Sequence, residues 1–166
     1  AGHGGKDPGA VSKGAEEKTV VFNVTKKLKA LLEAKGAIVY LTRSGDTFPE
    51  LSERVQYARN KNGEMFISIH ANAATAASAN GTETFHSISN NANGLEDAVL
   101  ARYINEEIVE NANMNDRKVK QADYYVIKNL VMPAVLVELG FITNDGDRAK
   151  LTSDKYQTIF AESIYN

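Results

Sequence analysis

The sequence predicts an α/β domain built around a largely parallel sheet. Segments whose apolar residues recur at helical spacing alternate with short, apolar, β-rich runs. One of these runs, 134–138 (AVLVE), is almost continuously apolar, as expected for a strand that is covered on both faces. A length of 166 residues is that of one ordinary domain, so we expect a single domain over 1–166.

Four segments are predicted to be helices. The first covers 16–35, where apolar side chains recur at spacings of three and four and form one stripe. These side chains are Val21, Val24, Leu28, Leu31 and Leu32. Gly36 is well placed to end this helix. Three further helices are expected over 49–62, 95–110 and 153–165.

Short β-rich runs predict the strands. We expect strands at 37–42, 65–70, 82–87, 124–127 and 134–138, separated by turn and loop signals. The run 82–87 is expected at an edge of the sheet. The Gly-rich opening, 1–14, and the small-residue segment 73–81 are expected to be loops.

Composition excludes several classes of protein. No apolar run approaches the ~20 residues that a membrane span needs. A net charge of −2 argues against a nucleic-acid partner, and the basic clusters Lys26-Lys27-Lys29 and Arg117-Lys118-Lys120 are interpreted as solvated faces. Without cysteine there is no disulfide and no thiolate metal site. No signal peptide is recognisable, and the chain is expected to be a domain excised from a longer protein.

Ionisable residues fall where strands and helices meet loops. His70 closes the run 65–70 and Glu138 closes 134–138, so two parallel strands would bring both to one edge of the sheet. His3 lies in the Gly-rich opening, and Glu17 lies in the first turn of the first helix. Taken alone, each has an ordinary interpretation: a polar strand end, a solvated terminus, or a helix N-terminal charge that Glu16 would supply equally well.

Together, these residue types suit metal chemistry. Two imidazoles and one carboxylate are a ligand set for catalytic zinc, leaving a fourth position for water whose pKa falls to about 7. A second carboxyl that does not bind the metal, Glu138, could then carry the proton, and burial would raise its pKa. From the residues alone, the sequence indicates a possible metal hydrolase.

An ordered series of motifs covers nearly the whole chain. The motifs are Gly2-His3-Gly4-Gly5 with Asp7-Pro8-Gly9-Ala10, Glu17-Lys18, Leu41-Thr42-Arg43 with Asp46, Leu51 with Arg54, Ser68-Ile69-His70-Ala71-Asn72-Ala73, Gly81-Thr82-Glu83-Thr84, and 133–144 (PAVLVELGFITN). In this order they resemble the zinc-dependent N-acetylmuramoyl-L-alanine amidases of bacterial cell-wall remodelling, sporulation and phage lysis.

The resemblance implies a specific site. One Zn²⁺ would be held by His3, Glu17 and His70, with Glu17 chosen over Glu16 because the family's ligand directly precedes a lysine. Glu138, in the Val-Glu-x-Gly-Phe motif, would be the catalytic residue. The reaction would be hydrolysis of the amide between N-acetylmuramic acid and the L-alanine of peptidoglycan.

The resemblance also implies a fold and a setting. The family fold is a twisted sheet of about six strands flanked by helices, of which the first strand would be missing here. The protein would act outside the cytoplasm, in the cell wall or secreted. We expect a monomer whose wall-targeting modules lie outside this domain. The short loop 73–81 leaves no room for the inhibitory helix of activator-dependent relatives, which suggests an open site.

Other motif residues receive secondary roles. Arg43 and Arg54 are expected to be structural, pairing with carboxylates such as Asp46. Asn72 is expected to support a neighbouring ligand, and His86 to lie at the surface or a strand edge.

Two other functions are weighed against the amidase, and the second is disfavoured. A non-catalytic peptidoglycan-binding or scaffold domain would bind glycan without metal or bond cleavage. A zinc carboxypeptidase would show His-x-x-Glu, but Lys6 stands three residues after His3.

Overall fold

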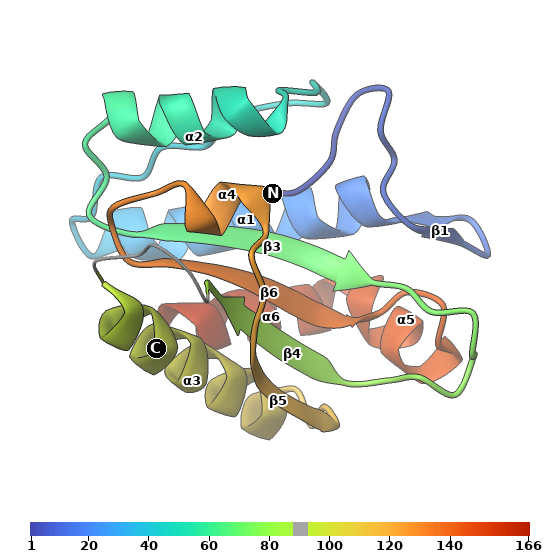
Figure 1. Cartoon of the computed structure of the whole chain (residues 1–166). Coiled ribbons are helices and arrows are strands. Elements are labelled where there is room, and N and C mark those ends of the chain that lie inside the picture. Colours follow the sequence, from blue (N-terminus) through green and yellow to red (C-terminus); the bar gives the residue numbers. More distant parts are fainter. Residues whose placement is uncertain (88–92) are drawn as a thin grey trace.

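The computed structural model describes residues 1–87 and 93–166, and there the central sheet has four strands. Their order is β3 (Phe66–Asn72), β6 (Ala134–Phe141), β4 (Thr82–His86) and β5 (Asp116–Gln121) (Figure 1). The β3–β6 and β4–β5 pairs are parallel, whereas β4 and β6 are antiparallel. The α/β class is therefore confirmed, with a mixed sheet of four strands where about six were expected.

Six helices and a short hairpin complete the described structure. The helices are α1 (Glu17–Ala34), α2 (Leu51–Asn60), α3 (Gly94–Asn111), α4 (Tyr125–Lys128), α5 (Asp145–Leu151) and α6 (Asp154–Tyr165). The four helices predicted from periodicity are α1, α2, α3 and α6. The sequence did not predict α5 or the hairpin of β1 (Val11–Ser12) and β2 (Ala15–Glu16). None of the described helices is long and apolar enough to cross a membrane.

Alternate residues along the strands point to opposite faces of the sheet and pack in two separate hydrophobic cores. Ile69, Val135 and Val137 pack with residues of α1, α3 and α6. On the opposite face, Ala134 and Leu136 pack with residues of α2 and α4. In Figure 1, α6 lies behind the sheet and α4 in front of it. This double cover explains the nearly continuous apolar sequence of β6.

The face covered by α2 and α4 also carries the polar residues of interest. Glu138 follows Ala134 and Leu136 on that face but lies outside their core. Its register partner on β3 is His70, and its register partner on β4 is Glu83. Because paired residues point to the same face, three ionisable side chains form a row across three adjacent strands. Since β3 and β6 continue to Asn72 and Phe141, His70 and Glu138 precede the strand ends rather than close them.

The segment 37–42 was predicted to be a strand, and this prediction is wrong. It is irregular in the structure, and Ile38 is 80 % exposed. A β-rich run needs a partner strand to satisfy its backbone and pack its side chains. Among the described residues, no strand pairs with this run.

The segment 124–127 was also predicted to be a strand, but it falls mostly within helix α4. Val126 and Ile127 are buried in the core under α2 and α4, so their burial, not strand pairing, explains their apolar character. The strand of this region is instead β5, formed by the basic run that was interpreted as a solvated face. Charged side chains are typical of an edge strand, because they discourage pairing with other chains.

Strand β4 was predicted at the edge of the sheet, but it lies between β6 and β5. All five of its residues are buried. His86, expected at the surface or a strand edge, is therefore buried and 8 % exposed. The polar character of β4 reflects buried hydrogen bonds, such as that from the Thr84 hydroxyl to Asn105, rather than contact with solvent.

Candidate metal centre and neighbouring carboxyl

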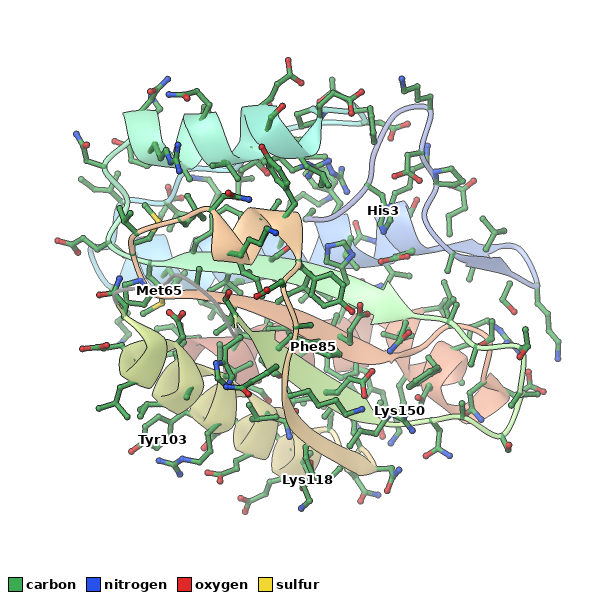
Figure 2. The ribbon with its side chains drawn as sticks, in the orientation of Figure 1. His3, Met65, Phe85, Tyr103, Lys118 and Lys150 are labelled. Atoms are coloured by element: carbon green, nitrogen blue, oxygen red, sulfur yellow. The ribbon has the colours of Figure 1, made fainter. Side chains whose placement is uncertain are left out.

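Three elements distant in the sequence bring His3, Glu17 and His70 together. His3 lies in the N-terminal loop, Glu17 is the first residue of α1, and His70 is in β3. Nε2 of His3 and Nδ1 of His70 each lie 3.0 Å from Oε1 of Glu17. The two imidazole rings meet edge to face, with centroids 5.0 Å apart. Figure 2 shows His3 near the beginning of α1. One ligand atom from each residue lies within 4.8 Å of the others, so the three could bind a metal ion.

Glu17 is surrounded by hydrogen-bond donors. Its side chain is 6 % exposed, and its two oxygens accept backbone N–H groups of Ala71 at 3.0 Å and Ala10 at 2.9 Å. Burial alone would raise the pKa of this carboxyl, but hydrogen bonds from His3 and His70 lower it well below its ordinary value. Glu17 is therefore ionised over the physiological range and suited to a cation.

The two histidines differ in their surroundings. Burial lowers the pKa of His70, which favours the neutral imidazole that can offer a lone pair to a metal. Burial opposes the charge on His3 too, but its hydrogen bond with Glu17 raises its pKa overall. Nδ1 of His3 donates to Asp7 at 2.7 Å, which fixes the ring with Nε2 towards Glu17. A carboxylate on the far nitrogen is the usual means of orienting a metal-binding imidazole.

Two buried arginines hold the loop that carries His3. Arg54 donates to the carbonyl oxygens of Ala1 and His3, both at 2.8 Å. Arg43 donates to the carbonyl of Gly2 at 3.0 Å and to that of Lys18, at the start of α1, at 2.9 Å. The expected structural role of both arginines is confirmed, but their hydrogen bonds go to backbone carbonyls rather than to carboxylates. Asp46 instead accepts from Gly5 N–H and the Lys18 ammonium.

Two glycines allow the loop to approach the ligand residues closely. A Cβ at Gly2 would lie 2.2 Å from Cε1 of His70. Gly9 has φ +66°, and a Cβ there would lie 2.5 Å from Oε2 of Glu17. A side chain at either position would displace a candidate ligand, which explains the Gly-rich opening physically.

Glu138 lies beside this cluster in a different environment. It is the register partner of His70, yet its Oε2 is buried without a hydrogen-bond partner among the described residues. Desolvation raises its pKa well above the ordinary value, and the negative charges of Glu17 and Glu83 add to the effect. A raised pKa makes this carboxyl suited both to accept and to return a proton, as an acid–base group must.

Sequence reasoning missed Glu83, the third member of the row. Its side chain is 6 % exposed and accepts from Asn72 Nδ2 at 2.6 Å and Arg117 Nε at 3.0 Å, and it also pairs with the Lys120 ammonium. Asn72 therefore contacts Glu83, and its expected support of a neighbouring ligand is not seen. The alternation of Glu83 with Phe85 was visible in the sequence. What could not be read was that β4 pairs with β6 and so faces Glu138.

Comparison with known proteins places this chain in a family. Residues 1–166 match the model of the family Amidase_3, N-acetylmuramoyl-L-alanine amidase. The chain is 41 % identical over 165 residues to the N-acetylmuramoyl-L-alanine amidase LytC of Bacillus subtilis, covering 99 % of this chain and 33 % of LytC. It is 42 % identical over 166 residues to YqiI of the same organism, covering all of this chain and 79 % of YqiI.

A solved structure gives the same result. The catalytic domain of CwlV, an N-acetylmuramoyl-L-alanine amidase from Bacillus (Paenibacillus) polymyxa var. colistinus, superposes with a TM-score of 0.91 at 35 % identity. The match covers 99 % of this chain and 90 % of that one. The likeness therefore extends over the whole described fold, whereas the chain spans only a third of the length of LytC.

Proposed function

The chain belongs to the N-acetylmuramoyl-L-alanine amidase family, and from that premise we propose that it hydrolyses the amide between N-acetylmuramic acid and L-alanine in peptidoglycan. The observation that carries the proposal is the juxtaposition of His3, Glu17 and His70 with Glu138, whose buried Oε2 has no hydrogen-bond partner in the part of the chain that the structure describes. Residues 1–166 would act as one catalytic domain outside the cytoplasm, at the cell wall, with targeting modules elsewhere in the protein.

The ligand set fits one zinc ion. Two imidazoles and a carboxylate are typical ligands of catalytic zinc, and here one ligand atom from each lies within 4.8 Å of the others. Nε2 of His3, Oε1 of Glu17 and Nδ1 of His70 are the atoms that would hold it. When bound, zinc supplies a Lewis acid that polarises the amide carbonyl, lowers the pKa of water to about 7 and favours the ionised form of nearby carboxyls.

Glu138 is the proposed proton carrier. Its carboxylate takes a proton from the attacking water as the new C–O bond forms at the lactyl carbonyl carbon. It then gives that proton to the nitrogen of L-alanine as the C–N bond breaks, which releases a free amine. The Oε2 atom of Glu138 is buried, which favours transfer of the proton to the leaving group over its loss to solvent.

Digestion of purified peptidoglycan tests the proposal directly. We expect new L-alanine amino termini without new reducing sugars, lost on addition of a chelator and restored by zinc. New reducing ends would identify a glycosidase and contradict the proposal. Cleavage that resists exhaustive chelation would contradict the assignment of the metal.

A further inference from the structure

A group of charged side chains lies next to Glu138 on the same face of the sheet. Glu83 is the register partner of Glu138 on β4, and Arg117 and Lys120 reach it from β5. Glu83 is 6 % exposed, whereas the side chains of Arg117 and Lys120 are 32 % and 40 % exposed. We call these three residues the β5 cationic cluster. Two positive charges against one negative leave it with a surplus positive charge facing solvent.

Glu83 holds the two cations in place. Its Oε2 accepts from Arg117 Nε and Lys120 Nζ, and its Oε1 accepts from Asn72, so both oxygens are occupied. The Arg117 guanidinium also lies over the ring of Phe141, with Cζ 4.7 Å from the centroid, so it reaches from β5 back to β6. Glu83 uses only one of the five N–H donors of Arg117. Nη1 of Arg117 also reaches the carbonyl oxygen of Asn80 at 3.5 Å, and the other N–H donors of the guanidinium are left for a ligand.

The spacing of the sheet sets the distance from this cluster to the reacting bond. Strand β5 is two strands from β6, which corresponds to about 10 Å between their backbones. Arg117 and Lys120 point back from β5 towards Glu83, which shortens the gap to Glu138. The stem peptide begins at the nitrogen of the cleaved amide. Its second residue ends two residue lengths from that nitrogen, at most about 7 Å away. The β5 cationic cluster therefore lies at a distance from the reacting bond that the second stem residue can reach.

We propose that Arg117 and Lys120 bind the free α-carboxylate of the second stem residue of peptidoglycan, a γ-linked D-glutamate. This inference rests on the proposed function, because it assumes that the amide before L-alanine is cleaved beside Glu138. A surplus cation held by a buried carboxylate suits an anionic ligand, and charge-assisted hydrogen bonds to guanidinium are strong. Amidation of this α-carboxyl converts the residue to D-isoglutamine and removes its negative charge. Arg117 and Lys120 then have no carboxylate to bind.

Two synthetic substrates test this assignment. Both are N-acetylmuramoyl tripeptides ending in L-lysine amide, and they differ only in whether the second residue is γ-linked D-glutamate or D-isoglutamine. With the zinc-loaded protein, kcat/KM for the D-glutamate substrate should be about tenfold higher, mostly through KM, as expected for one charge-assisted hydrogen bond. Arg117→Gln and, separately, Lys120→Gln should bring the ratio of the two kcat/KM values towards one.

Lys118→Gln is the matched control. Lys118 is on the same strand but 77 % exposed, pairs with Asp116, and lies at the margin of the molecule in Figure 2. Its replacement removes the same charge and should leave the preference intact. Lys120→Gln keeps the Arg117–Glu83 pair, so it remains informative if Arg117→Gln fails to fold.

Binding separates this inference from the proposed function. The same two tripeptides are titrated calorimetrically into the Glu138→Gln variant, which measures the preference without cleavage. Equal binding and equal cleavage of both tripeptides would overturn the carboxylate site and leave the amidase proposal standing. A preference in binding, with no cleavage of either tripeptide by the unaltered protein, would support the carboxylate site and contradict the amidase proposal.

Discussion

Glu17 is buried and Glu138 is half-buried with one buried oxygen, and the surroundings of these two carboxyls act on them in opposite directions. Glu17 accepts from two backbone N–H groups and two imidazoles, which lower its pKa. Oε2 of Glu138 has no partner among the described residues, and desolvation raises its pKa. Both experience the cost of burial, so the supply of donors decides which carboxyl is ionised.

The comparison separates two chemical tasks. An ionised carboxylate with donors on both oxygens is suited to hold a cation in a fixed place. A carboxyl whose pKa is raised well above its ordinary value is suited to move a proton. We therefore propose Glu17 as a metal ligand and Glu138 as the acid–base residue, and each of the following changes tests one side of the contrast.

The largest effect is expected from Glu138→Gln. The amide keeps the size of the side chain but cannot carry the proton, so turnover should fall roughly 10²- to 10⁴-fold. Zinc content should stay at that of the unaltered protein, because the ligand set does not include Glu138. Turnover is measured as new L-alanine amino termini, and zinc by elemental analysis. Near-normal turnover would show that Glu138 is not the proton carrier.

Glu17→Gln should act on the metal first. The change removes the charged member of the ligand set, so we expect loss of bound zinc and, with it, of activity. It also weakens the hydrogen bonds from Ala10 and Ala71, which should cost about 1–3 kcal/mol of unfolding free energy. Glu16→Gln is the matched control, since it removes the same charge one residue earlier. Zinc retained at full occupancy in Glu17→Gln would remove Glu17 from the ligand set.

A smaller effect is expected from Gly2→Ala. The new methyl group would lie 2.2 Å from the His70 ring, which must turn away from Glu17. Zinc affinity, measured by competition with a chelator, should fall about 10- to 100-fold, as it does when ligand orientation is disturbed. Gly45→Ala is the control, because a Cβ there meets nothing within 4 Å. Equal zinc affinity in both variants would mean that the position of His70 does not limit binding.

The smallest effect is expected from Asp145→Asn. Asp145 is an exposed carboxyl that has charged partners. Hydrogen bonds and charges of Lys13 and Arg148 lower its pKa from 3.8 to about 2. A folded-state pKa below the unfolded value stabilises the protein above pH 4, and this contribution disappears as the pH falls through about 2.

The difference in Tm between the unaltered protein and Asp145→Asn should therefore be small at pH 5 and vanish near pH 2. Because the pair is exposed, salt should also reduce it. A difference that is constant from pH 2 to pH 5 would show that charge is not its origin.

Part of the fold was accessible from local patterns alone. The stripe through Val21, Val24 and Leu28 predicted α1, and the apolar run of β6 indicated a strand covered on both faces. The convergence of His70 and Glu138 followed from the expected parallel pairing, which β3 and β6 form. The identities of the candidate ligands came from the family resemblance, and the structure brings those residues together.

The sequence by itself determined periodicity, the positions of the long helices and the residue types available for metal chemistry, because these depend on neighbours within a few positions along the chain. Only the tertiary structure decided that 37–42 stays irregular, that β4 lies inside the sheet and that Glu83 faces Glu138. The pairing of β4 with β6 and β5 depends on contacts between segments dozens of residues apart, which no local pattern contains. The same pairing surrounds Glu83 with cations, whereas Oε2 of Glu138, one strand away, has no donor among the described residues.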